Sequence, residues 1–245
     1  MAANLNIVRE RLFKGYNDRL APEFLPAGYL ADALNCFIRT GEIVKRNGYT
    51  IIGNDLGANA CQGLKGVRFA DGTQRIYAVF NGGVYSKTDT TSTAWTSLGG
   101  TLSTTANVEI VPANNAVYFF DGVNTVVKVT SGNVLSTVAA IPIGTIGVWF
   151  HNAMYVTGVS GLPNRLRISN NGDPEDYSAG TQATLDVNPN DGDYVTAMHP
   201  LNNELIVFKT QRAWSLTGFG TSALTLANLN ERLSGFGTLS QRAVV

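Results

Sequence analysis

The chain has 245 residues, of which 44 % are hydrophobic and 15 % are charged, and its formal net charge is zero. This length is sufficient for one large all-β domain or for two ordinary domains with a buried core. The lack of net charge excludes attraction to nucleic acid or to an anionic membrane by a global electrostatic field. The longest apolar run, residues 138–150, is broken by proline and glycine and is shorter than the roughly 20 residues of a membrane helix.

The N-terminal part of the chain differs from the rest in composition. Its first residues lack the apolar core of a signal peptide, so we expect synthesis to finish in the cytoplasm. Pro22, Pro26 and Gly28 then punctuate a segment that is expected to be extended. We predict an N-terminal arm over residues 1–40, followed by a β-domain over residues 41–245.

Four segments of similar composition follow the arm and predict a repeat architecture. Each is a short β-branched and aromatic run, with anchors roughly 40, 37 and 50 residues apart at Tyr77, Tyr118, Tyr155 and Ile206. Clusters of glycine, asparagine and aspartate separate the runs, as turns between strands would. No stretch shows a long helical period, which argues against an α/β enzyme. Several runs are apolar on both faces, so we predict an all-β fold of short antiparallel strands arranged as β-propeller-like repeats.

The last residues, 235–245, read as the first strand of a further repeat. Either this strand closes the ring against the N-terminal part of the domain, or the chain is a fragment of a longer protein. The second alternative is favoured, since repeats of about 40 residues leave space for only four or five of them. We therefore expect an incomplete or truncated propeller with an incomplete last blade.

The sequence contains no recognisable catalytic or metal-binding motif. Cys36 and Cys61 match neither a zinc ribbon nor a redox pair, and we expect reduced, mostly buried thiols. His151 and His199 lie in different repeats and lack a second ligand at metal-binding spacing. The serine-hydrolase elbow and the nucleotide-binding loops are also missing. We predict no enzymatic activity, no metal and no cofactor.

One polar segment partly matches a calcium loop. Asp186-Val-Asn-Pro-Asn-Asp-Gly-Asp offers oxygen ligands at alternate positions. However, Asp191 stands where the sharp-turn glycine belongs, and Ala197 stands where the bidentate glutamate belongs. A polar turn is the favoured interpretation.

A second polar segment, residues 169–177, resembles the Asp-box turn of sialidase propellers, compressed by one residue. Such a box is structural. Its acids Asp173, Glu175 and Asp176 could include a glycosidase carboxylate, but three acids in one turn are more often a solvated loop.

Aromatic and basic residues in the repeats offer further candidate contacts. Trp95, Trp149 and Trp214 could stack on sugar rings or pack at a subunit interface, although core packing is favoured. Arg165 and Arg167 alternate along one predicted strand, so both could reach a neighbouring subunit or a negatively charged lumen. A surface salt-bridge role is equally consistent with their positions.

Two stretches carry a resemblance to a known family. Residues 17–49 contain Leu20-Ala-Pro-Glu-Phe-Leu-Pro, then Ala31-Asp-Ala-Leu-Asn and Lys45-Arg-Asn-Gly. Residues 164–218 contain Gly172-Asp-Pro, Asp191-Gly-Asp and Glu204-Leu-Ile-Val-Phe-Lys in this order. Both stretches resemble the propeller-bearing structural proteins of tailed bacteriophages, such as the nozzle, hub and stabilisation-type proteins of short-tailed phages. Family members commonly continue beyond the point where this chain stops.

The resemblance implies a virion structural protein of the tail, made in the host cytoplasm, that acts by oligomeric assembly around the DNA path. The implied partners are further copies in a homo-oligomeric ring such as a hexamer, and other tail, adaptor or portal proteins. DNA would pass through the lumen without specific binding, and no membrane insertion is expected. No catalytic residue carries over. The arm residues expected to contact a neighbour are Leu20, Pro22, Leu25, Pro26, Leu30 and Asn35.

Two alternatives remain open. The first is a phage fibre or depolymerase that binds or cleaves host surface glycans, with the tryptophans as sugar platforms and an acid from residues 173–176. The second is a kelch-like interaction module that binds a soluble partner as a monomer.

Overall fold

The computed structural model describes residues 15–16, 21–26, 29–30, 36–39, 42–45, 53–88, 94–178, 183–217 and 228–244. The chain divides into two compact units, Met1–Ile51 and Ile52–Val245. The described residues form strands and turns, with two short 3₁₀ helices, η1 (Pro22–Phe24) and η2 (Gln241–Ala243). The prediction of an all-β fold of short antiparallel strands is therefore confirmed. Within these ranges no helix has the length and apolar composition needed to span a bilayer.

The first unit contains two small sheets. β1 (Gly15–Tyr16) pairs in parallel with β2 (Tyr29–Leu30). β3 (Cys36–Arg39) and β4 (Glu42–Lys45) form an antiparallel hairpin whose register places Arg39 opposite Glu42. The predicted end of the arm at residue 40 falls between these two strands, both of which belong to the first unit.

The second unit contains four antiparallel sheets, each a meander of four consecutive strands. Sheet I comprises β5 (Cys61–Arg68), β6 (Gln74–Phe80), β7 (Gly83–Lys87) and β8 (Thr96–Gly99). Sheet II comprises β9 (Glu109–Ala113), β10 (Ala116–Phe120), β11 (Val126–Thr130) and β12 (Leu135–Val138). Sheet III comprises β13 (Ile146–Phe150), β14 (Ala153–Thr157), β15 (Arg165–Ile168) and β16 (Ala183–Asp186). Sheet IV comprises β17 (Val195–Leu201), β18 (Glu204–Lys209), β19 (Arg212–Thr217) and β20 (Asn228–Ser234).

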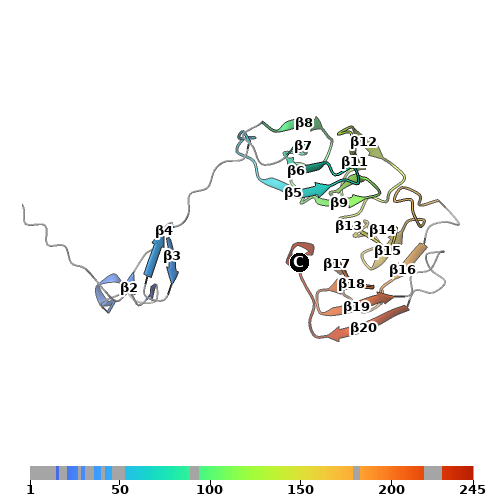
Figure 1. Cartoon of the computed structure of the whole chain (residues 1–245). Coiled ribbons are helices and arrows are strands. Elements are labelled where there is room, and N and C mark those ends of the chain that lie inside the picture. The colour runs from blue at the N-terminus through green and yellow to red at the C-terminus, as the bar shows by residue number, and fades with distance from the viewer. Residues whose placement is uncertain are drawn as a thin grey trace, which may run out of the picture. The chain divides into compact units, whose positions relative to one another are not determined.

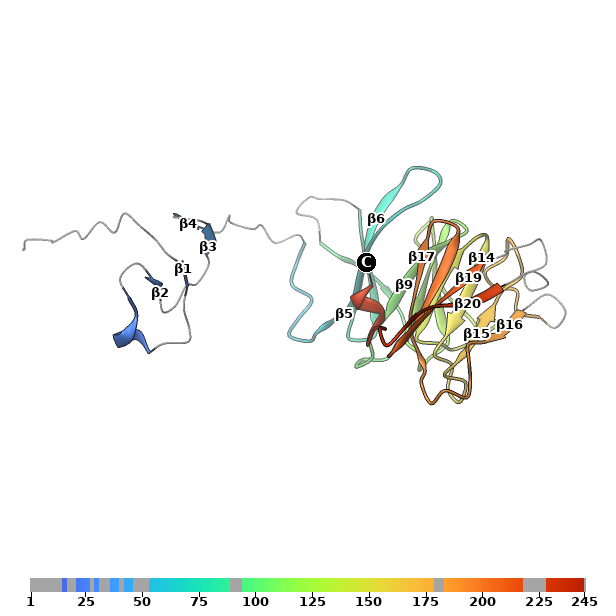
Figure 2. The ribbon, with the colours of Figure 1, turned by 90° about the horizontal axis from the view of Figure 1, so that it is seen from below.

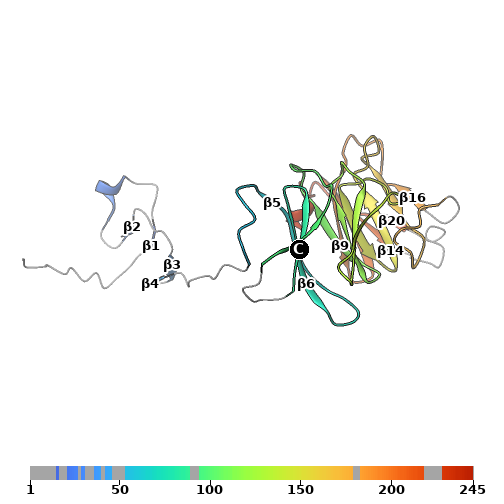
Figure 3. The same ribbon diagram turned by 90° about the horizontal axis from the view of Figure 1, so that it is seen from above.

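The four sheets follow one another in chain order around an arc (Figure 1). The first strands β5, β9, β13 and β17 are neighbours in this order along the inner side of the arc, and β8, β12, β16 and β20 lie on its outer side. Seen from below and from above, the hairpin turns project from the ends of the sheets (Figures 2 and 3). Among the described strands, the first and last inner strands, β5 and β17, do not pair with each other.

Short turns with positive φ connect several of these strands. Asn114 and Asn115 join β9 to β10 at φ values of 43° and 58°. His151 and Asn152 join β13 to β14 at 46° and 58°. A two-residue turn of this handedness matches the right-handed twist of the paired strands, and asparagine tolerates it better than most residues. His151 is therefore a turn residue, which explains its position without any chemical role.

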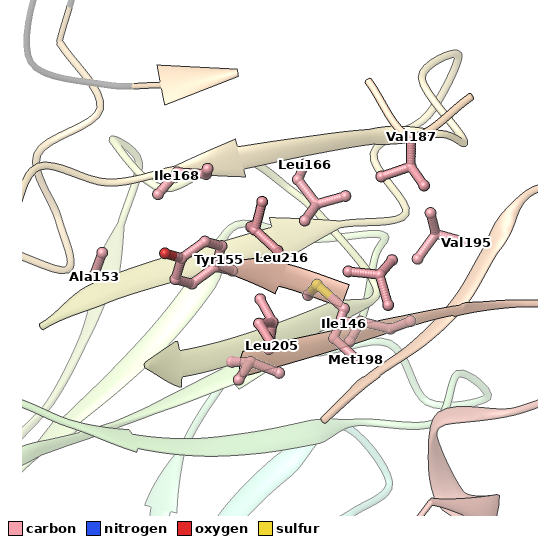
Figure 4. Packing of buried hydrophobic residues seen from close by; sticks show 12 residues of the cluster. Ile146, Ala153, Tyr155, Leu166, Ile168, Val187, Val195, Met198, Leu205 and Leu216 are labelled. Atoms are coloured by element: carbon pink, nitrogen blue, oxygen red, sulfur yellow. The ribbon is translucent and has the colours of Figure 1, made fainter. Parts of the chain in front are cut away.

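The hydrophobic core lies between the sheets. One buried cluster joins sheets I and II, a second joins II and III, and a third joins III and IV. Figure 4 shows the third cluster, in which Tyr155 and Leu166 of sheet III face Met198 and Leu205 of sheet IV. The anchors predicted from the sequence fall on the second strand of each sheet, and the three tyrosines among them are almost fully buried. Sheets II and III each lie between two other sheets, which explains why β10 and β14 are apolar on both faces.

The structure of the C-terminal segment differs from the strand that the sequence predicted there. A strand was predicted over residues 235–245, but the described part of this segment contains no strand and ends in η2. Gly235 has a φ of 83°, which breaks the extended run, and the Ser240 hydroxyl accepts a hydrogen bond from the Arg242 N–H as the N-cap of η2. Sheet IV contains all four of its strands, β17 to β20, and is therefore a complete meander.

Candidate functional site

A groove that contains several charged and polar side chains lies along the inner strands of the arc. One cavity of about 790 Å³ is bounded by β5, β9, β17 and η2, and its charged and polar lining consists of Lys65, Glu109, His199, Gln241 and Arg242. A second cavity of about 410 Å³ shares Glu109, Gln241 and Arg242 with the first. The groove is a concave surface on which several polar groups converge, so it is a candidate binding site.

The charges in this groove are mixed. Burial raises the pKa of the Glu109 carboxyl above its usual value, and the positive charges of Lys65 and Arg242 oppose this shift only in part. His199 is half-buried and lines the groove from β17. Its position in a groove was not predicted from the sequence. Across the described residues, no group of three or more His, Cys, Asp or Glu side chains could hold a metal ion. The groove thus offers hydrogen bonds and charges, without an arrangement that resembles a nucleophile and its base.

Residues 235–244, hereafter the C-terminal strap, form one wall of the groove. The Thr238 N–H donates to the Lys209 carbonyl at 3.0 Å, and the Thr196 hydroxyl donates to the Thr238 carbonyl at 2.7 Å. Gly237 lies so close to sheet IV that an added Cβ would be 2.0 Å from the Lys209 oxygen. Only glycine can occupy this position without displacing the strap.

The end of the strap contacts both end sheets of the arc. The side-chain amide of Gln241 accepts from the Met198 N–H at 2.8 Å and donates to the Met198 carbonyl at 2.9 Å. It therefore satisfies the inner edge of β17 as a paired strand would. The Arg242 guanidinium donates to the Gln62 carbonyl of β5, and Figure 2 shows the C-terminal end beside that strand. The strap thus links sheet IV to sheet I.

Gln62 and Thr196 were not identified from the sequence as functional positions. Each lies at a register shift in the first strand of an end sheet. Gln62 accepts from the Gly82 N–H at 2.8 Å and donates to the Ala106 carbonyl at 2.7 Å, so it holds the segment that leaves sheet I. Thr196 holds the strap in the same way as the chain leaves sheet IV. Both are polar residues near the start of the first strand of a sheet, a pattern too common to identify this role from the sequence.

The segment with partial calcium-loop character forms a buried ion pair instead. The Lys209 ammonium, with no exposed side-chain surface, lies 2.8 Å from Asp191, whose side chain is 7 % exposed. Lys209 also donates to the Asn188 carbonyl at 2.9 Å. Burial alone would raise the pKa of the Asp191 carboxyl, but the hydrogen bonds from Lys209 and from the Asp193 N–H hold it below its usual value. Asp191 and Lys209 thus tie the segment between β16 and β17 to the end of β18.

The turn at residues 169–177 is tied to sheet III. The Ser169 hydroxyl accepts from the Met154 N–H at 2.9 Å, and the Tyr177 hydroxyl donates to the Met154 carbonyl at 2.9 Å. Asn170 donates to the Asp176 carboxylate at 3.2 Å, which closes the turn. These contacts match the structural role expected of an Asp-box-like turn.

The acids of this turn have partners within the fold. Glu175 accepts from the Tyr118 hydroxyl at 2.7 Å and forms an ion pair with Lys128, so the turn also reaches sheet II. Burial would raise the pKa of Glu175, but hydrogen bonds from Lys128 and Tyr118 hold it below its usual value. Asp173 accepts from the Glu175 N–H at 2.9 Å. A general acid needs a raised pKa, so this arrangement does not suit Glu175 for glycoside cleavage.

The three tryptophans are half-buried. Trp149 packs against the cluster between sheets II and III, and Trp214 packs against the cluster between sheets III and IV. Core packing therefore accounts for both. Arg165 forms a bidentate pair with Asp186 at 2.7 and 2.8 Å, which is the surface salt bridge considered among the sequence-based alternatives.

The expectation for Cys61 was wrong, because its side chain is exposed. Cys61 begins β5 at the end of sheet I, where its thiol donates to the Gly63 carbonyl at 3.3 Å. The side chain of Cys36, in β3, lies outside the described residues.

The predicted arm contacts fall partly outside the described residues. Leu20 and Asn35 are not described, whereas Pro22 begins η1 and Leu30 ends β2. Leu25 is half-buried and Pro26 is exposed. The neighbouring Phe24, which the sequence analysis did not single out, has 75 % of its surface exposed.

Comparisons with known proteins give a fold and no function. No protein-family model matches the chain, and no curated protein matches it. The chain is similar to the crystal structure of the extracellular domain of the putative hybrid two-component system BT4673 from B. thetaiotaomicron. The TM-score is 0.51 at 13 % identity, over 77 % of this chain and 26 % of that one. Human WBSCR16 matches with a TM-score of 0.43 at 9 % identity, over 81 % of this chain and 55 % of that one. The chain spans only a part of either structure, and the first likeness concerns the fold alone.

Proposed function

We propose that the chain is a structural protein of a tailed-phage virion, in which sheets I to IV are blades of a β-propeller and the first unit is an assembly arm. It acts by joining an oligomeric ring of the tail, and it carries out no chemical reaction. The observation that carries this proposal is the ordered set of phage-like motifs at residues 17–49 and 164–218 in a chain of repeated four-stranded meanders.

The propeller arrangement is supported by the order of the strands. Each sheet is a simple meander whose first strand lies on the inner side of the arc, and each sheet packs against the next through a buried cluster. Radial repetition of four-stranded sheets around a centre is the arrangement that defines a propeller.

A structural role is supported because the side chains that were candidates for catalysis already have partners within the fold. Asp191 neutralises a buried lysine, and Glu175 joins sheet II to sheet III. The tryptophans that would have to face a glycan are half-buried. The two acids, Trp149 and Trp214 have structural partners within the fold, as expected of a scaffold, and this engagement supports a structural role over glycan cleavage.

An assembly role for the arm is supported by the surface of residues 21–26. Phe24 and Pro26 are exposed, while the Phe24 N–H donates to the Ala21 carbonyl at 2.9 Å and holds the turn. An aromatic side chain presented by a fixed turn is suited to fill a pocket on a neighbouring subunit or tail protein. A neutral chain with a mixed-charge groove also suits passage of DNA without specific binding.

Deletion of residues 1–51, the whole first unit, tests this proposal. The second unit contains its own clusters of buried residues, so the shortened chain is expected to fold and to unfold cooperatively on heating. It should no longer join phage particles assembled in a host that lacks the intact gene. The variant Phe24→Ser tests the same surface within the full chain, with Val134→Ser as a control at an exposed turn of sheet II. Normal incorporation of the deletion variant would contradict an assembly role for the arm.

A further inference from the structure

The junction between the first and last sheets of the arc is built differently from the junctions between consecutive sheets. Each pair of consecutive sheets is joined by a cluster of buried apolar side chains. Among the residues that the structure describes, no such cluster joins sheet IV to sheet I, and β5 does not pair with β17. The C-terminal strap spans this junction. Separation of the two end sheets would therefore leave the three buried clusters intact, which makes this junction the easiest one to open.

The strap is bound firmly to sheet IV. Hydrogen bonds join Thr238 to Lys209 and to Thr196. The Gln241 side chain pairs with both backbone groups of Met198, which is 0 % exposed. Release of Gln241 would take these partners from a buried N–H and a buried carbonyl, and such a loss is costly. We therefore expect the strap to remain part of sheet IV.

The contact of the strap with sheet I is easier to release. Within the described residues, the hydrogen bond that joins them runs from the Arg242 guanidinium to the Gln62 carbonyl. That carbonyl also accepts from the Val108 N–H at 3.0 Å, so it keeps a partner when Arg242 leaves. Arg242 is exposed, so water can solvate its guanidinium after release. Its charge also attracts the Glu109 carboxylate, on which Lys65 continues to act when Arg242 has moved away.

From this asymmetry we infer that the strap is a latch, and that the second unit opens at the junction between sheets I and IV. In the closed arrangement, Arg242 holds the strap against Gln62. In the open arrangement, the guanidinium is released into water and the strap moves with sheet IV. The groove then widens, because it has β5 on one side and η2 on the other. The inference rests on contacts within the second unit, and not on the assignment to a phage tail.

Distances between the two end sheets, measured by pulsed electron paramagnetic resonance on the full chain, test this latch. Nitroxide labels are attached at Thr96→Cys in β8 and at Asn230→Cys in β20. Both positions are exposed and lie on the outer strands, away from the strap. Cys36 and Cys61 are replaced by serine in every protein measured, so that only the two introduced thiols react.

Arg242→Ala removes the latch contact, and Arg68→Ala is the control, since Arg68 is an exposed arginine at the end of β5. We expect one narrow distance distribution in the labelled parent and in the control. Arg242→Ala should increase a longer-distance population by about tenfold, because a hydrogen bond from a charged group is lost. Amide exchange at Met198 should stay slow in this variant, since Gln241 still pairs with it.

Two results would overturn the latch. An Arg242→Ala distance distribution equal to that of the parent would show that the end sheets stay together without this contact. Fast exchange of the Met198 N–H in Arg242→Ala would show that the strap leaves sheet IV rather than sheet I. Thermal unfolding of each labelled protein separates both results from a general loss of the fold.

Discussion

The buried ammonium of Lys209 holds the segment between β16 and β17 against the end of β18. Replacing Asp191 with asparagine removes its counter-ion and leaves a positive charge without exposed surface. Because an unpaired buried charge is costly, the Asp191→Asn variant should lose about 3 to 5 kcal/mol of unfolding free energy, measured by urea denaturation at neutral pH.

The exposed pair of Arg165 and Asp186 provides the control, since its side chains are 36 % and 39 % exposed. The Asp186→Asn variant should unfold close to the wild-type midpoint, because water solvates the arginine that remains. Equal losses in both variants would show that Lys209 is not held as a buried charge.

Glu109, which lines the groove, is expected to make the unfolding free energy of the protein depend on pH. Burial raises its pKa above the usual value of 4.5, so the folded state binds this proton more tightly than the unfolded state does. The contribution is fully present below pH 4.5 and is lost as the pH rises through the raised pKa. Glu109→Gln should therefore gain stability over the wild type as the pH rises across that window. Unfolding by urea at a series of pH values measures the difference, and a difference that is flat with pH would refute the effect.

The C-terminal strap is the element that connects the two ends of the arc. Gln241→Ala removes both hydrogen bonds to Met198, so the Met198 N–H should exchange with deuterium about tenfold faster. Arg242→Ala is the control, since Arg242 contacts Gln62 on the other end sheet. Unchanged exchange at Met198 in Gln241→Ala, measured by NMR, would mean that the strap does not protect β17.

Among the strands, the second strand of each sheet was predictable from the sequence. The outer strands were less predictable. The runs around Tyr77, Tyr118 and Tyr155 are apolar on both faces because each strand lies between two sheets or beside a buried cluster. The outer strand β8 and the last strand β20 consist mostly of exposed residues, so they leave no hydrophobic pattern to detect. The strap was misread because its Phe236 and Leu239 suggest a strand, although both side chains are largely exposed.

The candidate site was only partly predictable. Asp191 and Glu175 are recognisable from the sequence as turn acids. Their pairing with Lys209 and Lys128 is not, because these contacts join segments that are far apart in the chain. The groove was not predicted at all. Its residues come from β5, β9, β17 and η2, and no local pattern brings Lys65, Glu109 and Gln241 together.

At the scale of the whole molecule, several large apolar side chains are exposed among the described residues. The arm exposes Phe24, and the end sheets of the arc expose Leu64 and Leu201. The chemical groups inside the second unit are used instead to hold its sheets together. The proposed structural role therefore predicts that the chain acts through the assemblies that it joins. Its function would be measured on those assemblies.

Electron cryomicroscopy of purified particles that contain this chain tests the account most directly. Its result is the position and copy number of the chain's density. We predict a ring of several copies around the DNA path in the tail, with the second unit as part of a propeller and the arm in contact with a neighbouring subunit or tail protein. Trimeric density at the periphery of the particle, away from the DNA path, would contradict a ring-forming structural role and would favour a fibre that binds glycans.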